Sequence, residues 1–487
     1  MNKRMVFYTL GNMIRIEALL LVLPAICSFI YGENKSLAAF LITIAIAFLV
    51  GTALTLFNKT KDKNIFAREG FVIVALAWIA LSGIGAIPFV ISGEIPSYTD
   101  AFFETASGFT TTGASILRDV EALSHGILFW RSFTHWIGGM GVLVLMMALV
   151  PTDTGRTMHI IRAEMPGPIV GKLVPRVRST AKILYLIYIV LTFTQWLLLV
   201  LGGMPVFDSF IHSFGTAGTG GFGLKGDSIA SYSAYSQWVI AIFMLIFGVN
   251  FNLYYLILMR KIRSVFKSEE LWVYLGIVFV SVSAITIDIY SKYNTFGEAL
   301  RISVFQVASI ISTTGFSTAD FNLWPTLSKT ILFLLMFSGA CAGSTAGGLK
   351  VSRLVLLFKQ VRSNLRHMLH PRSVESVRLE GKTVDNETLT SVTTYFALYF
   401  LCFTAIFLIL AIADPFDLET NISATAACFN NIGPGLAGVG PMSSYADYSV
   451  ISKWTLSAGM LLGRLEILPL ILLFAPGAWT RSNVKKG

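Results

Sequence analysis

The sequence predicts an all-α polytopic membrane protein. Of its 487 residues, 54% are hydrophobic and only 13% are charged, and the mean hydropathy is +0.70. A soluble chain of this size cannot hide so much apolar side-chain surface from water. Long apolar runs follow one another along the chain, and a short glycine-containing phrase recurs in four of the connections between them.

Ten apolar runs are long enough to cross a bilayer as helices, which takes about 20 residues each. Arg15 and Glu17 interrupt the first run, and no convincing cleavage site follows it, so we interpret it as an uncleaved span and not as a signal peptide. The predicted transmembrane helices cover approximately residues 7–31, 37–57, 70–92, 125–149, 183–201, 237–259, 272–289, 326–355, 390–413 and 450–474.

The recurring phrase follows a weaker apolar run in each of four connections. Each connection is too short to cross the membrane twice, which indicates a re-entrant loop formed by a half-helix and an extended strand. The phrases lie at intervals of about a hundred residues, so the sequence predicts a fourfold internal pseudo-repeat resembling a potassium-channel pore. They are Thr110-Thr111-Thr112-Gly113, Gly218-Thr219-Gly220-Gly221, Ser312-Thr313-Thr314-Gly315 and Asn430-Asn431-Ile432-Gly433.

The predicted architecture is therefore two N-terminal transmembrane helices followed by four repeats of helix, pore loop and helix. Residues 1–69 form the N-terminal pair. The four pore repeats are 70–182, 183–270, 271–389, which includes an intramembrane gating loop, and 390–487, which ends in a cytoplasmic tail.

The basic residues predict the orientation. Lys and Arg are concentrated at both termini and in alternate loops, whereas acidic residues dominate the opposite loops. Because basic loops are retained in the cytoplasm, both termini are expected there, and the four phrases are expected to open to the outside. The net charge of +10 follows from this bias and does not indicate nucleic-acid binding.

The four phrases have the chemistry of a potassium filter. Backbone carbonyl oxygens can replace the hydration shell of K⁺, and glycine permits the backbone angles and close approach that four converging strands require. Threonine adds a hydroxyl and favours an extended backbone. The expected K⁺ ligands, the only metal site predicted, are Thr111, Thr112, Gly113, Thr219, Gly220, Gly221, Thr313, Thr314, Gly315, Asn431, Ile432 and Gly433.

A glycine-rich stretch at 339–350 is expected to break the eighth span and form a movable barrier below the filter. The alternatives are a phosphate-binding loop, which lacks the usual Gly-Lys-Ser/Thr ending, and a patch of small residues for helix packing. Arg464, near the middle of the tenth span, is expected to face the pathway and bond to the broken loop. The predicted gating residues are Gly343, Ser344, Thr345, Ala346, Gly347, Gly348 and Arg464.

Other polar residues in the spans have no assigned function. Arg131, His135, Asn250 and Asn252 are expected to make interhelical hydrogen bonds, and Glu466 is not placed to pair with Arg464. The cysteines and histidines lack metal-ligand spacing, and no enzymatic or organic-cofactor site is predicted. The basic stretch 362–387 is interpreted as a solvated cytoplasmic loop, long enough to dock a partner.

These motifs together resemble the Trk/Ktr/HKT superfamily of potassium transporters, and within it the bacterial Trk membrane subunits. The resemblance covers nearly the whole chain. It rests on residues 102–104, 110–114, 162–168 (Arg-Ala-Glu-Met-Pro-Gly-Pro), 220–222, 341–350, 430–435 and 463–466.

The resemblance implies a homodimer with one pore per protomer and a filter centred on Gly113, Gly221, Gly315 and Gly433. It also implies a gating loop in the third repeat above a cytosolic ring of nucleotide-binding regulatory subunits. Sodium-carrying members often have serine at the first filter glycine, so Gly113 fits potassium.

The expected function is potassium uptake across the bacterial inner membrane. An H⁺- or Na⁺-coupled K⁺ symporter remains an alternative, with Glu466 or Glu104 as candidates for a second ion site. A membrane receptor or enzyme that uses the basic loops would leave the fourfold phrase unexplained.

Overall fold

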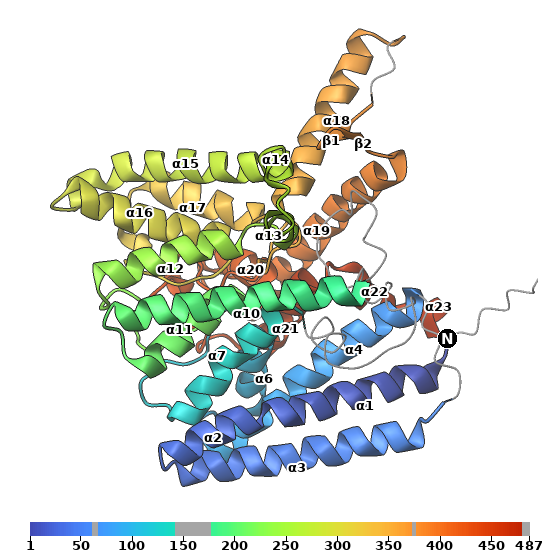
Figure 1. Ribbon diagram of the computed structural model, residues 1–487, viewed down its shortest axis with the longest axis vertical. Helices are drawn as coiled ribbons and strands as arrows, with labels where there is room; N and C mark the ends of the chain where they lie inside the picture. Colours follow the sequence, from blue (N-terminus) through green and yellow to red (C-terminus); the bar gives the residue numbers. More distant parts are fainter. Residues whose placement is uncertain (61–66, 142–176, 373–375, 480–487) are drawn as a thin grey trace, which may run out of the picture.

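The computed structural model describes residues 1–60, 67–141, 177–372 and 376–479, and these ranges are almost entirely α-helical (Figure 1). The second part of the predicted fourth span, the motif at 162–168 and the tail after 479 lie outside the described residues. The first helices are α1 (Lys3–Leu20), α2 (Val22–Ile30), α3 (Asn34–Phe57), α4 (Ala67–Gly85), α5 (Ile87–Ser92), α6 (Tyr98–Phe109) and α7 (His125–Gly139).

The rest of the chain continues as helices, with one small hairpin. These elements are α10 (Val177–Leu201), α11 (Val206–Gly218), α12 (Ala234–Phe247), α13 (Phe251–Leu258), α14 (Ile262–Phe266), α15 (Glu269–Ile289), α16 (Phe296–Ile311), α17 (Thr326–Ser338), α18 (Val351–Leu369), β1 (Arg378–Leu379), β2 (Lys382–Thr383), α19 (Asn386–Ala413), α20 (Leu418–Phe429), α21 (Val450–Arg464), α22 (Leu468–Phe474) and α23 (Pro476–Trp479).

Six helical stretches in the described residues are long and apolar enough to span a membrane, and a seventh is the pair α12 and α13 if it counts as one span. This supports a membrane protein, while the predicted count of ten spans stays a prediction. The six stretches are Lys3–Ile30, Asn34–Phe57, Arg68–Ser92, Ala181–Leu201, Glu269–Lys292 and Asn386–Ala413.

Several predicted spans are broken. α12 and α13 meet at 89°, where the Asn250 side chain caps α13 by accepting a hydrogen bond from the Asn252 N–H at 2.9 Å. The predicted break at 339–350 is confirmed, because α17 ends at Ser338 and α18 begins at Val351. The tenth predicted span is interrupted after Arg464, where Glu466 and Ile467 both have positive φ.

Four short helices, α6, α11, α16 and α20, directly precede the four glycine phrases. Their 12 to 16 residues extend about 18–24 Å, which is less than the roughly 30 Å of the hydrocarbon core. Each has an acidic residue in its first turn, namely Asp100, Asp208, Glu298 and Glu419. The opposite ends, which carry the negative pole of the helix dipole, lead into the glycine phrases.

The packing of these short helices closes a circle. Each packs against a helix that follows the preceding glycine phrase in the chain: α11 against α7, α16 against α12, and α20 against α17. The last contact, between α6 and α21, joins the beginning and the end of the series. Four segments far apart in the sequence therefore surround one axis.

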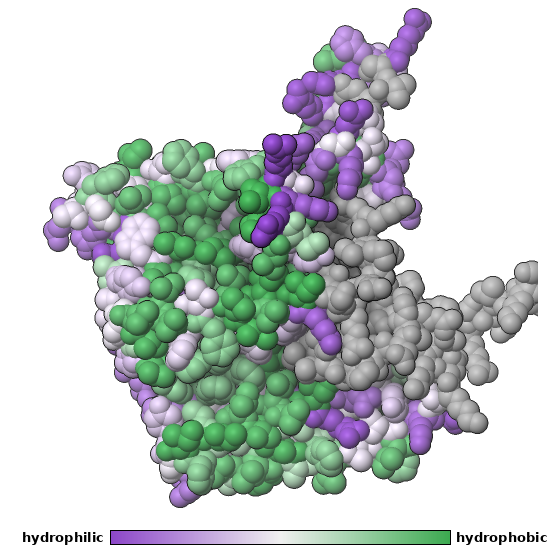
Figure 2. All heavy atoms as spheres, viewed as in Figure 1, coloured by the Kyte–Doolittle hydropathy of each residue, from purple (hydrophilic) through white to green (hydrophobic). Residues whose placement is uncertain are grey.

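The N-terminal helices lie along one side of this arrangement, where α1 packs on both α3 and α4 (Figure 1). Gly11 and Gly51 allow the backbones of α1 and α3 to approach closely, since a Cβ atom on Gly11 would lie 2.7 Å from the Gly51 carbonyl oxygen. Figure 2 shows a broad apolar surface over the long helices, with hydrophilic residues gathered on α18. An apolar exterior of this kind suits a lipid environment.

The stretch 362–387, which we expected to be a solvated cytoplasmic loop, is partly regular in its described residues. α18 continues as a helix to Leu369 and projects from the bundle (Figure 1). β1 and β2 then pair antiparallel around Glu380 and Gly381, whose positive φ values fit a two-residue hairpin turn. The predicted domain boundaries at 270/271 and 389/390 fall inside the first turns of α15 and α19.

Candidate ion pathway

The four glycine phrases share one backbone conformation. The residue two before each glycine has a φ of 56–57°, and these residues are Thr111, Thr219, Thr313 and Asn431. The next residue donates its N–H, at 2.8 Å in every loop, to a carbonyl of the preceding short helix; the acceptors are Ser107, Gly215, Ser309 and Ala427. The left-handed residue thus ends each helix and redirects the chain toward the axis.

The glycines of the four phrases lie against one another in a ring. A Cβ atom on Gly113 would lie 2.0 Å from the Gly220 carbonyl oxygen, and one on Gly221 would lie 2.0 Å from that of Thr314. A Cβ atom on Gly315 would lie 2.0 Å from the Ile432 carbonyl oxygen, and one on Gly433 would lie 2.7 Å from that of Thr112. Each glycine also has a φ of 79–97°. No other residue fits this conformation and this spacing without displacement of the backbone.

The twelve residues predicted as K⁺ ligands are therefore brought together by the fold, in sequence order around the ring. Their side chains are partly engaged in hydrogen bonds behind the backbone. Thr112 Oγ1 lies 2.8 Å from Thr110 Oγ1, and the Asn431 amide donates to Thr112 Oγ1 at 2.9 Å. The fourth loop differs in one respect, because the Tyr445 hydroxyl donates to the Gly433 carbonyl at 2.8 Å.

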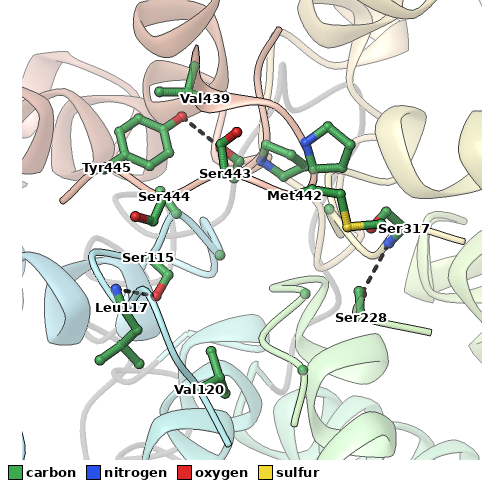
Figure 3. Close-up of a pocket in the computed structure, with 18 of the residues that line it drawn as sticks. Ser115, Leu117, Val120, Ser228, Ser317, Val439, Met442, Ser443, Ser444 and Tyr445 are labelled. Carbon is green, nitrogen blue, oxygen red and sulfur yellow. Dashed lines mark hydrogen bonds between the residues drawn. The ribbon is translucent and has the colours of Figure 1, made fainter. Parts of the chain in front are cut away.

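A cavity of about 530 Å³ opens beside this ring and is lined by all four glycines, Gly113, Gly221, Gly315 and Gly433. Figure 3 shows that its wall is built from four segments of chain, which contribute Ser115, Ser228, Ser317 and Ser443 among others. Glycine backbone and serine side chains line much of the space, and the lining also includes the charged side chains of Arg118, Arg131, Lys225 and Asp447. The volume is large enough for a hydrated cation.

An arginine on α7 supports the first two loops. Arg131 is buried, and its Nε donates to Glu104 Oε1 on α6 at 2.6 Å. Its Nη1 donates to the Gly223 carbonyl at 3.1 Å, and its guanidinium lies 3.6 Å from the centroid of the Phe222 ring. Glu104 also accepts from the Ile116 N–H at 3.0 Å. The buried charges are therefore paired and hydrogen-bonded, as burial requires.

His135 joins the same two loops. Its Nε2 accepts the Phe222 N–H at 3.3 Å, which leaves Nδ1 to donate to the Gly108 carbonyl at 2.8 Å. The predicted interhelical bonding is confirmed for Arg131 and His135. For Asn250 it stays a prediction, since the hydrogen bond described for its side chain is the local one from the Asn252 N–H that caps α13.

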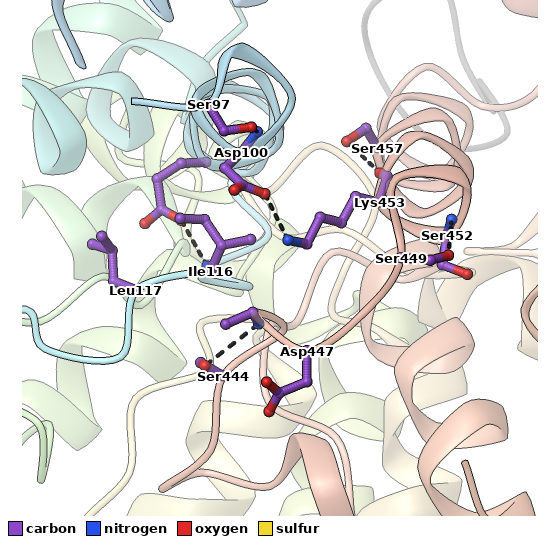
Figure 4. Close-up of polar contacts among 12 residues, drawn as sticks. Ser97, Asp100, Ile116, Leu117, Ser444, Asp447, Ser449, Ser452, Lys453 and Ser457 are labelled. Atoms are coloured by element: carbon purple, nitrogen blue, oxygen red, sulfur yellow. Dashed lines mark hydrogen bonds and ion pairs between the residues drawn. The ribbon is translucent and has the colours of Figure 1, made fainter. Parts of the chain in front are cut away.

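The fourth loop is tied to the first by side-chain contacts. Lys453 on α21 donates to Asp100 Oδ1 on α6 at 2.7 Å, and Figure 4 shows this contact between the two helices. Arg118 and Asp447 also form an exposed ion pair at 2.5 Å. The ring is therefore closed by side-chain contacts as well as by backbone contacts.

The broken span lies directly against the third and fourth glycine phrases. The Gly347 N–H donates to Thr313 Oγ1 at 2.7 Å, and a Cβ on Gly347 would lie 2.6 Å from the Asn430 carbonyl oxygen. The sequence predicted residues 343–348 in the ion path just inside the filter, as a movable barrier. These contacts place the loop beside the third and fourth glycine phrases, and its role as a barrier stays a prediction.

Arg464 connects this loop to α7. Its guanidinium donates to the Thr345 carbonyl at 2.8 Å and to the Gly138 and Gly139 carbonyls at 2.7 and 2.8 Å. The predicted contact between Arg464 and the broken loop is thus confirmed. Glu466, whose role the sequence left open, pairs with Arg353 of α18.

Two features were not predicted from the sequence. The Arg353–Glu466 pair joins α18 to the turn after α21, and Glu270 on α15 accepts backbone hydrogen bonds from both sides of the broken loop. The only sequence signal was the pair Glu269-Glu270 at the start of a span on the basic side of the membrane.

Comparison with known families identifies the arrangement. A family model described as "TrkH: Cation transport protein" matches residues 36–481. The chain belongs to the TrkH family. The TrkH potassium uptake protein of the Trk system from Salmonella typhimurium is 37% identical over 486 residues, covering 98% of this chain and 100% of the relative. TrkG of Escherichia coli is 34% identical and covers 98% of both chains.

The fold agrees with a solved member of the TrkH family. The crystal structure of the potassium transporter TrkH from Vibrio parahaemolyticus matches with a TM-score of 0.88 and 31% identity, covering 99% of this chain and 100% of that one. The chain is thus a transport protein of the Trk type and not an enzyme.

Proposed function

We propose that this protein takes up potassium across the bacterial inner membrane through the ring of four glycine loops. The closed ring of Gly113, Gly221, Gly315 and Gly433 is the observation that carries the proposal. Four backbones held at this spacing present carbonyl oxygens to one axis, and the negative ends of four short helices lead to the same place. The related TrkH and TrkG proteins are named as potassium uptake proteins.

Below the filter, the loop 343–348 and Arg464 form the barrier. A guanidinium beside the path repels cations, and its three carbonyl partners hold it between the loop and α7. Opening then requires the loop and Arg464 to move apart. The control comes from a cytosolic ring of nucleotide-binding subunits on the basic face, and two copies of this chain form a homodimer with one pore each.

A coupled symporter receives less support. The two carboxylates considered for a second ion site each face an arginine, Glu104 facing Arg131 and Glu466 facing Arg353. A carboxylate neutralised in this way is a poor site for a further cation. K⁺ uptake that depends on a proton or sodium gradient, in addition to the membrane voltage, would favour the symporter over the proposed function.

The filter is tested with Gly315→Ser, or with Gly113→Ser, in a liposome flux assay. Serine would meet a carbonyl oxygen of the next loop in a conformation with positive φ. We expect a loss of K⁺ over Na⁺ selectivity of about tenfold or more, since a shift of about 1.4 kcal/mol between two ions has that effect.

Gly297→Ser is the matched control, because Gly297 lies at the start of the same short helix, α16, with nothing within 4 Å of an added Cβ. Its selectivity should equal that of the unaltered protein. Unchanged selectivity in Gly315→Ser and Gly113→Ser would remove the filter assignment.

A further inference from the structure

Glu270 holds both ends of the intramembrane loop. It is the second residue of α15, its side chain is buried, and its Oε1 accepts the Ala342 N–H at 2.7 Å and the Ser352 N–H at 3.0 Å. These two amides stand on either side of the segment 343–351. One carboxylate oxygen therefore bridges the point where the chain leaves α17 and the point where it enters α18.

The neck of the loop contains few other bonds. The Val351 N–H donates to the Ala340 carbonyl at 3.0 Å, which is the backbone bond that closes the neck. The adjacent Cys341 N–H and Gly343 carbonyl bond to Gly248 and Phe251, where α12 breaks into α13. The loop is thus attached to the broken span formed by α12 and α13, while the Glu270 side chain joins the two ends of the loop.

Glu270 also supplies a hydrogen-bond acceptor for a backbone amide in the first turn of α18. The first amides of a helix have no partner within the helix, and a carboxylate near them is favoured by the helix dipole. Lys350, the residue before α18, makes no side-chain cap bond to the helix and has positive φ. Its Nζ instead donates to the Ala346 carbonyl inside the loop.

We propose that Glu270 is a positioning residue that latches the intramembrane loop in its place below the filter. The proposal rests on the proposed function, in which this loop and Arg464 form the barrier. With Glu270 bonded to Ala342 and Ser352, the loop and the start of α18 move as one body. Loss of both bonds frees the loop from α18 and favours the open pathway.

The test compares three variants in liposomes without the cytosolic partner. Glu270→Ala removes both acceptor bonds, and we expect K⁺ flux to rise about tenfold. Glu270→Gln keeps an oxygen at Oε1 that can accept both amides, so its flux should stay near that of the unaltered protein. Glu269→Ala removes the same charge from the same turn, but Glu269 pairs with Lys359 at a site about one third exposed, so flux should not change.

A second readout follows the loop itself. Cys341 is buried next to Ala342, and its labelling by an aqueous maleimide, located by peptide mass spectrometry, should increase in Glu270→Ala and not in Glu270→Gln. K⁺ over Na⁺ selectivity should remain unchanged in both variants, which a general disruption of the fold would not allow. If Glu270→Ala cannot be purified, Glu270→Asp serves, since the shorter side chain cannot reach both amides.

The outcomes separate this proposal from the proposed function. If Arg464→Ala raises flux and Glu270→Ala does not, the latch is overturned and the barrier stands. If neither variant raises flux, the barrier itself is overturned. Glu270→Gln with the same high flux as Glu270→Ala would show that the charge facing Lys350 matters and not the two hydrogen bonds, and it would also overturn the latch.

Discussion

At the scale of single residues, Arg464 has the most unusual position. Its guanidinium donates to three backbone carbonyls, Thr345 of the broken loop and Gly138 and Gly139 at the end of α7. These three carbonyl oxygens hold the guanidinium between the broken loop and α7. This position fits the role proposed for Arg464, which is to oppose cations and hold the loop 343–348.

For Arg464→Ala we expect K⁺ flux without the partner to rise about tenfold, because both a positive charge and the bonds to the loop are lost. Liposome flux of K⁺ measures it. Arg464→Lys keeps the charge but cannot reach three carbonyls from one planar group. Its flux should therefore lie between those of the unaltered protein and of Arg464→Ala. Flux in Arg464→Ala equal to that of the unaltered protein would contradict the barrier.

Single glycines could be identified from the sequence because each follows a short apolar run in a repeated phrase. The choice of Gly433 over Gly435 in the fourth phrase agrees with the ring, in which Gly433 lies next to Thr112 and Gly113. The hydrogen bond from Tyr445 to the Gly433 carbonyl could not be predicted, since it joins two positions of a loop without a regular pattern.

At the scale of elements, the pathway depends on helices that end early. α6, α11, α16 and α20 stop at the glycine phrases, and α12 and α17 stop where polar or glycine residues interrupt an apolar run. Composition indicated the break after Ser338, because glycine is unfavourable inside a helix. The 89° bend between α12 and α13 was not expected, since only Gly248 and Asn250 mark it in a strongly apolar run.

The contact between α1 and α3 gives a prediction at this scale. A side chain at Gly11 would meet the Gly51 carbonyl at 2.7 Å, so Gly11→Val should separate the two helices and cost about 1–3 kcal/mol of stability. Thermal unfolding in detergent measures it. Gly276→Val in α15 is the control, because nothing lies within 4 Å of an added Cβ there. Equal melting temperatures for the two variants would contradict the close packing.

At the scale of the whole molecule, the four loops, the broken span and α18 form one connected series. Glu270 joins the loop to α18, Arg353 of α18 pairs with Glu466, and Arg464 lies two residues before Glu466. α18 projects from the bundle with hydrophilic residues gathered on it (Figure 2). A partner that moves the projecting part of α18 would therefore act on the proposed barrier through this series of contacts.

For this reason we expect Arg362→Glu combined with Arg366→Glu, on the exposed part of α18, to abolish the nucleotide-dependent change of flux in the presence of the cytosolic partner. Flux without the partner should remain the same, because these residues lie outside the barrier. Lys35→Glu, an exposed residue at the start of α3, is the control. Unaltered regulation in the double variant would place the partner elsewhere.

The sequence by itself determined the membrane class, the four glycine phrases and the break at 339–350. Hydropathy, glycine content and short repeated phrases are local properties, so they can be recognised without knowledge of the fold. Only the tertiary structure decided which side chains hold these parts together, because the contacts join distant positions. Glu270 is hydrogen-bonded to Ser352, 82 positions away, and Arg464 to Gly138, 326 positions away. No local sequence pattern specifies such contacts.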